Sequence, residues 1–157
     1  MAVTVTSPAF AAGKPIPKKH TGEGPDVSPA LAWSGVPAGA RELALICDDP
    51  DAPRKDPWVH WVLYQIPAGC TGLPEKVGTA DRPAEIPGAV QGMNDFGRTG
   101  YGGPMPPPGH GIHHYHFTLY ALNAELSLPP GATKAQVLAA TKGKVLAQGE
   151  LVGTYQR

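Results

Sequence analysis

Glycine and proline residues divide this chain into short apolar runs. There are 20 glycines and 19 prolines among its 157 residues. A content this high can indicate disorder when it has no period, but here it separates strongly apolar segments. That arrangement is typical of turns that join short strands. The sequence therefore predicts a β-rich fold.

Three of the apolar runs predict strands clearly. Residues 42–47, ELALIC, form a nearly continuous apolar run, as expected for a strand with both faces covered. Residues 58–66, WVHWVLYQI, are rich in the aromatic and β-branched side chains that strands favour. Residues 113–122, HHYHFTLYAL, form the third run, and residues 3–6 and 31–33 are weaker candidates.

The run at 113–122 alternates, and successive side chains of a strand point to opposite faces. One face is predicted to carry His113, Tyr115, Phe117, Leu119 and Ala121. The opposite face is predicted to carry His114, His116, Thr118 and Tyr120. We expect the second face to be solvated.

One C-terminal helix is predicted. Thr133 is a suitable N-cap and Gln136 follows three residues later, which is a capping-box pattern. The helix can continue to Gly149, although Gly143 inside it favours a break or a bend. Its buried stripe would contain Val137, Leu138, Val145 and Leu146, and the tail ELVGTYQR would add a short final strand or extended segment.

These elements predict a single domain over residues 1–157, mostly β, with one helix packed on a sheet. The formal net charge is zero and no basic stripe is present, which argues against nucleic-acid binding. No apolar run approaches the roughly 20 residues that a membrane helix needs. The first residues lack the features of a signal peptide, so we expect a cytoplasmic protein. Cys47 and Cys70 are then expected to be reduced thiols, one in a strand and one in a turn.

Polar residues stand at the ends of these strands. DDPDAP, residues 48–53, follows the first strand, and His60 interrupts the second. The segment GYGGPMPPPGHGIHHYHF, residues 100–117, leads into the third. Each has an ordinary structural interpretation as well, because Asp residues favour turns and a strand histidine is often satisfied by a backbone carbonyl.

Several kinds of chemistry fit these residues poorly. His113 and His114 point to opposite strand faces, and His114 with His116 lacks a third ligand at a usual spacing, so the sequence predicts no metal and no cofactor. No GxxxxGK[ST] phosphate loop and no GxSxG nucleophile elbow occur. The three consecutive prolines at 106–108 have no N–H group, so they act as a fixed wall. Free donors in the loop would be the N–H groups of residues 109–111 and the nearby imidazoles.

Long motifs of the sequence resemble a known family. DDPDAP, DPWVHW and GYGGPMPPPGHGIHHYHFTLYAL look like the conserved regions of the phosphatidylethanolamine-binding proteins. SPAF, SPALAWSGVPAG, QGMNDFG and LVGTYQR extend the resemblance over nearly the whole chain. They are most similar to the bacterial and archaeal branch called Raf-kinase-inhibitor-like. The resemblance implies a large central antiparallel sheet packed on a smaller sheet, with peripheral helices.

The resemblance also implies a small anion pocket at one end of the sheet. The implied ligand-binding residues are Asp49, Asp51, Trp58, His60, Tyr101, Gly103, Pro106, Pro107, His113 and Tyr115. Met105 departs from the Gly or Cys that is usual at the rim. A carboxylate beside an imidazole favours the charged ring, which would hold a phosphate oxygen.

Three functions stay open at this point. The first is a non-enzymatic binding protein for a small phosphorylated ligand or phospho-head group, with a kinase or protease as a further partner. The second is a small hydrolase that uses Asp49 and His60 as an acid–base pair. The third is a protein–protein module that acts through its loops. We also expect a cis Ala52–Pro53 bond, and, from the resemblance, a homodimer.

Overall fold

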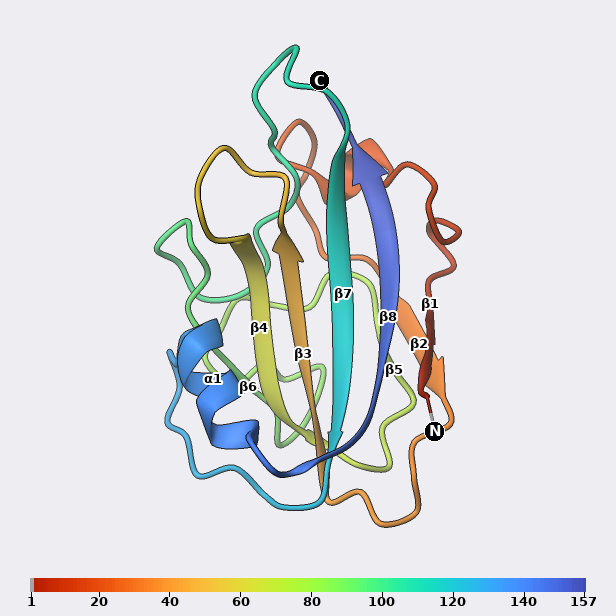
Figure 1. Cartoon of the computed structure of the whole chain (residues 1–157), viewed down its shortest axis with the longest axis vertical. Helices are drawn as coiled ribbons and strands as arrows, with labels where there is room; N and C mark the ends of the chain where they lie inside the picture. Colours follow the sequence, from red (N-terminus) through yellow and green to blue (C-terminus); the bar gives the residue numbers. More distant parts are fainter. Residues whose placement is uncertain (1) are drawn as a thin grey trace.

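The computed structural model describes residues 2–157 and contains two antiparallel sheets (Figure 1). The larger sheet has the strand order β6-β4-β3-β7-β8, and the smaller has the order β1-β2-β5. The strands are β1 (Thr4–Thr6), β2 (Leu31–Ser34), β3 (Glu42–Asp49), β4 (Trp58–Pro67), β5 (Gly72–Leu73), β6 (Val90–Gln91), β7 (His113–Leu122) and β8 (Val145–Tyr155). The helices are the 3₁₀ turn η1 (Lys18–His20) and α1 (Lys134–Thr141). The predicted β-rich class, with two sheets and a C-terminal helix, is confirmed.

Apolar side chains cover both faces of β3. Leu43, Leu45 and Cys47 pack into the core between the two sheets, while Ala44 and Ile46 pack into a second core that includes Val137 of α1. The run at 42–47 is almost entirely apolar because both faces of this strand are buried, as the sequence predicts. Both cysteines are free thiols, with Cys47 buried in β3 and Cys70 half-buried after β4.

The two faces of β7 differ as its alternation predicts. His113, Tyr115, Phe117, Leu119 and Ala121 are all buried, whereas residues 114, 116, 118 and 120 are exposed or half-buried. The buried face looks toward the smaller sheet, because its apolar members belong to the core between the sheets. His113 and Tyr115 therefore lie at the end of that core, where β7 begins.

The C-terminal helix is shorter than the sequence predicts. Thr133 and Gln136 form the expected capping box. The helix ends at Thr141 instead of Gly149, because the backbone leaves helical geometry at Lys142 and Gly143 follows with a positive φ of 78°, in agreement with the break predicted at Gly143. The chain then enters β8, whose first residue, Val145, pairs with Leu122 of β7. Val145 and its neighbour at 146 are exposed, so the predicted helical stripe at these two positions was wrong.

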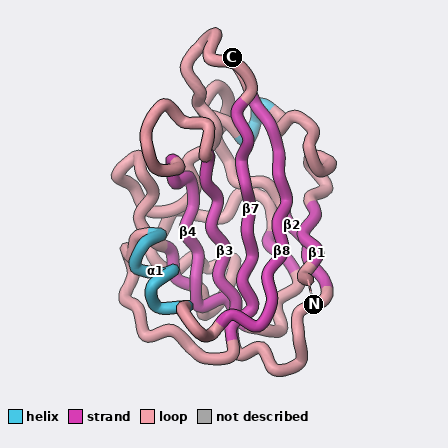
Figure 2. The backbone as a smooth tube through the Cα atoms, in the orientation of Figure 1, coloured by secondary structure: helices cyan, strands magenta, loops and turns pink. Residues whose placement is uncertain are grey.

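Loops gather at one end of the larger sheet (Figure 2). The β3–β4 connection, residues 50–57, and the segment before β7 both lie there, together with the C-terminus (Figure 1). Over residues 2–157, no helix has the length and apolar character needed to cross a membrane.

Candidate functional site

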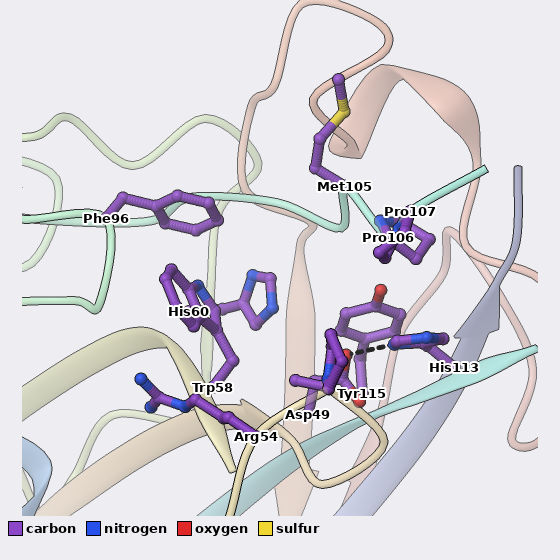
Figure 3. Close-up of a pocket in the computed structure, with 12 residues that line it drawn as sticks. Asp49, Arg54, Trp58, His60, Phe96, Met105, Pro106, Pro107, His113 and Tyr115 are labelled. Carbon is purple, nitrogen blue, oxygen red and sulfur yellow. Dashed lines mark hydrogen bonds and ion pairs between the residues drawn. The ribbon is translucent and has the colours of Figure 1, made fainter. Parts of the chain in front are cut away.

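A cavity of about 310 Å³ opens at this loop-rich end (Figure 3). Strand ends supply some of its lining and the loops supply the rest. The lining residues are Asp49, Ala52, Pro53, Arg54, Trp58, His60, Phe96, Met105, Pro106, Pro107, His113 and Tyr115. Seven of the ten residues implied by the family resemblance thus line one cavity, while Asp51, Tyr101 and Gly103 do not.

A β-bulge turns His60 toward this cavity. The pairing of β3 with β4 runs from Cys47↔Trp61 directly to Asp48↔Val59, so His60 is an extra residue in β4. A bulge of this kind reverses the alternation of the strand beyond it. Trp61 and His60 can then both face the side of the sheet that carries Tyr115, and the rings of His60 and Tyr115 meet edge to face with centroids 5.1 Å apart.

One ring nitrogen of His60 is committed to the backbone. Its Nδ1 lies 2.6 Å from the carbonyl oxygen of Gly102, and because a carbonyl only accepts, Nδ1 carries the hydrogen and donates it. Burial lowers the pKa of His60, and it outweighs the Gly102 carbonyl and the nearby carboxylate of Asp49, which favour the charged ring. The expectation that a neighbouring carboxylate keeps this imidazole charged was therefore wrong for His60.

Asp49, His113 and His110 form a chain of side chains from the buried wall to the surface. The Nδ1 of His113 donates to Oδ2 of Asp49 at 2.6 Å, and both side chains are almost fully buried. The Nε2 of His113 lies 2.6 Å from Nδ1 of His110, an exposed residue of the loop before β7. Asp49 pairs with His113 and not with His60, so the predicted Asp49–His60 acid–base pair is not formed. No sequence pattern indicated that His110 would contact His113.

Tyr115 supplies a hydroxyl to the cavity. The hydroxyl points toward Pro106 and Pro107 (Figure 3). Burial raises the pKa of Tyr115, and the carboxylates of Asp49 and Asp51 raise it further. The phenol therefore stays protonated, and it can donate to a ligand at any pH near neutrality.

An aromatic wall and a cation complete one side of the cavity. The guanidinium of Arg54 lies over the ring of Trp58, 4.6 Å from its centroid, and Phe96 meets the same ring edge to face at 5.4 Å. Arg54 also forms an ion pair with Asp95, outside the lining. Arg54, which directly follows DDPDAP, and Phe96, which lies within QGMNDFG, were not predicted as site residues.

The proline loop forms the wall that the sequence predicts. Pro106 is buried and Pro107 is exposed, and Met105 lines the rim with its side chain largely exposed. Arg157 holds this loop, since its Nε donates to the carbonyl oxygen of Pro106 at 2.6 Å. The N–H groups of Gly109 and His110 donate to the carbonyl oxygens of residues 157 and 107, so the prediction of free donors at these two positions was wrong.

The three predicted site residues outside the lining have structural contacts. The carboxylate of Asp51 accepts two hydrogen bonds from His114, on the opposite face of β7. The hydroxyl of Tyr101 donates to the carbonyl oxygen of His20 at 2.6 Å. A Cβ at Gly103 would lie 2.2 Å from that same carbonyl oxygen, so only glycine lets this segment approach and lead into the proline loop.

The turn after β3 closes without a cis bond. Among residues 2–157 every peptide bond is trans, so the predicted cis Ala52–Pro53 bond was wrong. The N–H of Asp51 donates to Oδ1 of Asp49 at 2.8 Å, and the N–H of Arg54 donates to the carbonyl oxygen of Ala52 at 2.7 Å. These two local hydrogen bonds tighten the turn with both prolines trans.

Comparison with known proteins gives the family. Residues 6–156 match the sequence model of the family described as Phosphatidylethanolamine-binding protein. The chain belongs to this family. Two relatives show how closely the phosphatidylethanolamine-binding protein fold and sequence are shared. A UPF0098 protein of Methanothermobacter thermautotrophicus is 52% identical over 142 residues, which cover 90% of this chain and 91% of that protein. The crystal structure of Escherichia coli YbcL, described as a new member of the mammalian family, superposes with a TM-score of 0.92 at 36% identity and covers 100% of this chain and 99% of YbcL.

A third relative of this phosphatidylethanolamine-binding protein comes from Mycobacterium tuberculosis. LppC of Mycobacterium tuberculosis, whose name includes the word lipoprotein, is 46% identical over 154 residues, which cover 98% of this chain and 72% of LppC. The bacterial and archaeal branch predicted from the motifs is confirmed by these relatives.

Proposed function

We propose that this phosphatidylethanolamine-binding protein is a non-enzymatic binding protein whose cavity takes a phosphorylated head group or another small phospho-ligand. One observation carries the proposal. His60, His113 and Tyr115 come from two strands and line a single cavity of about 310 Å³, which suits a phosphate group with a short substituent. Trp58 and Phe96 provide an apolar wall for that substituent.

Two features of the cavity support binding over hydrolysis. The acid–base pair of the hydrolase hypothesis would need contact between Asp49 and His60, but each is bonded to another group. The described lining contains no Ser, Thr, Cys or Lys, and both oxygens of its carboxylate, Asp49, already accept hydrogen bonds, so these common nucleophiles of covalent catalysis are absent or engaged. Purified protein should therefore bind a phosphate monoester without turning it over.

Calorimetric titration with methyl phosphate tests this proposal. We expect saturable binding by the wild-type protein, weakened about ten-fold or more in His113→Ala, because losing a hydrogen bond to a charged group costs about 1.5–3 kcal/mol. His114→Ala is the matched control, since His114 lies on the exposed face of the same strand. Equal losses in both variants, or release of inorganic phosphate during the titration, would contradict the proposal.

We also propose that the protein contacts a protein partner, which would be a kinase or a protease. Met105 and Ile112 expose apolar side chains on the loop beside the cavity, where a kinase or a protease could contact both the loop and the pocket. Enzyme assays with a purified kinase or protease, with and without this protein, test that contact. Unchanged enzyme rates would restrict the function to small ligands.

Two further proposals concern the assembly and the location of the protein. We propose a homodimer, which light scattering at high micromolar concentration would refute by giving the mass of one chain. We propose a cytoplasmic location, and the lipoprotein name of LppC makes cell fractionation the direct test.

A further inference from the structure

The hydrogen bond between His60 and Gly102 determines what the cavity can recognise. Because Nδ1 of His60 donates to the buried carbonyl of Gly102, the neutral ring has its lone pair on Nε2. His60 lines the cavity, and Nε2 is the ring nitrogen that remains free to meet a ligand. A lone pair attracts a hydrogen-bond donor and repels a bare anionic oxygen.

The neighbouring polar groups do not reverse this preference. Both oxygens of Asp49 already accept hydrogen bonds, from the ring of His113 and from the N–H of Asp51. His110 covers the outward nitrogen of His113. Asp49 also adds a buried negative charge to the cavity wall, which disfavours a doubly charged ligand more than a singly charged one.

The charged and titratable groups around His60 come from several elements. Asp48 and Asp49 end β3, Tyr115 belongs to β7, Asp26 lies in the segment before β2, and Arg54 lies in the turn before β4. The three carboxylates favour an imidazolium at His60, but burial outweighs them. The ring therefore remains an acceptor near neutral pH.

We infer that the cavity selects the singly protonated form of a phosphate monoester, whose P–O–H group donates to Nε2 of His60. This inference rests on the proposed function and specifies its ligand. The remaining phosphate oxygens would accept from the hydroxyl of Tyr115, from the guanidinium of Arg54 and, once the ligand has displaced His110, from Nε2 of His113. His60 thereby becomes the residue that distinguishes an oxyanion with a proton from one without.

The affinity should then follow the proton on the ligand. A phosphate monoester has its second pKa near 6, so most molecules carry one proton at pH 5.5 and about one in a hundred does at pH 8. Methyl phosphate should consequently bind roughly fifty- to a hundred-fold more weakly at pH 8 than at pH 5.5.

Methyl sulfate gives the decisive comparison. It has the same tetrahedral oxygens and the same single negative charge as protonated methyl phosphate, but it has no proton to donate. At pH 5.5 we expect calorimetry to show methyl phosphate binding about ten-fold or more tightly than methyl sulfate, because the sulfate leaves the His60 acceptor unpaired. Equal affinities at pH 5.5 would show a charged His60 and would overturn this inference while leaving phosphate binding intact. Absence of binding by both compounds would overturn the proposed function, and this inference with it.

A substitution at position 60 completes the test. His60→Asn can keep an N–H group near the position of Nδ1, for the Gly102 carbonyl, but it removes Nε2. We expect the preference for methyl phosphate over methyl sulfate to fall to within about three-fold, since one hydrogen bond distinguishes the two ligands. An unchanged preference in the folded variant would overturn the inference. The wild-type comparison at pH 5.5 and 8 gives its own answer if the variant does not fold.

Discussion

The imidazole of His110 lies against the imidazole of His113, with 2.6 Å between the Nδ1 atom of the first and the Nε2 atom of the second. The other nitrogen of His113 donates to the carboxylate of Asp49, so its Nε2 is the only ring nitrogen with which it can meet a ligand. A surface residue of the proline loop thus occupies the binding atom of a buried one. Any anion that is to accept from His113 has to replace His110.

Removal of His110 should therefore strengthen binding. We expect His110→Ala to bind methyl phosphate about two- to ten-fold more tightly, because the competing hydrogen bond is worth about 0.5–1.5 kcal/mol. Calorimetry at pH 6 measures this change. Weaker binding would instead identify His110 as a direct ligand contact.

Removal of His113 should destabilise the fold as well as the site. The carboxylate of Asp49 is almost fully buried, and His113→Ala would leave it without its imidazole partner. Leaving a buried charge without its partner in this way typically costs about 3–5 kcal/mol. Urea denaturation at pH 7 measures the loss, and His113→Asn, whose amide can still donate to Asp49, should recover most of it. Equal losses in both variants would mean that packing, not the pairing of Asp49, makes His113 important.

Removal of the Tyr115 hydroxyl should weaken binding by the same factor at every pH. Burial raises the pKa of Tyr115, so the phenol remains a neutral donor between pH 5.5 and 8.5. Tyr115→Phe should cost about ten-fold in affinity for methyl phosphate, as expected for one lost hydrogen bond to an anion. A loss that changed with pH would show that the hydroxyl acts together with a titrating neighbour.

Asp51 should contribute little to binding, although the family resemblance implies it as a ligand-binding residue. Its carboxylate pairs with His114 on the exposed face of β7, so Asp51→Asn should leave the affinity for methyl phosphate within about two-fold, far less than the loss of a charged hydrogen bond would cause.

Burial alone would raise the pKa of Asp51, but hydrogen bonds from His114 outweigh it and lower that pKa. The pair therefore stabilises the fold above the unfolded pKa of about 3.9, and this contribution is lost as pH falls through the folded pKa. For an exposed pair it should stay below about 1 kcal/mol, as urea denaturation at pH 7 and pH 3 would show.

Strand alternation and turn residues made much of the fold predictable. The period of two in HHYHFTLYAL correctly separated the buried face of β7, with His113 and Tyr115, from its exposed face. The helix end was not predictable from the apolar pattern, because Val145 could continue a helical stripe as well as begin a strand. Val145 belongs to a strand because it pairs with Leu122 of β7, a residue more than 20 positions earlier in the chain.

The site was only partly predictable, for a different reason. The resemblance supplied His60, His113 and Tyr115, but their partners depend on geometry that no local pattern encodes. His110 and Asp49 meet the same ring from opposite sides because two loops converge at the end of the sheet. Asp51 matches the motif equally well, but it lies in the turn after β3, where strand alternation no longer applies, and its carboxylate accepts hydrogen bonds from His114 on the opposite face of β7.

Because His60 is the extra residue of a bulge, ligand recognition depends on a residue that has no partner in the pairing of β3 with β4. A chain without residue 60 would pair Cys47 with Trp61 and Asp48 with Val59 without an extra residue between them, and it would lose the hydrogen bonds of His60 to Gly102 and its ring contacts. Such a deletion would remove this one bulge, keep the other register shift of the β3–β4 pair, and take from the cavity the acceptor that we propose for the ligand. In this chain, ligand recognition would then change through one codon, while the strand order of the two sheets stayed the same.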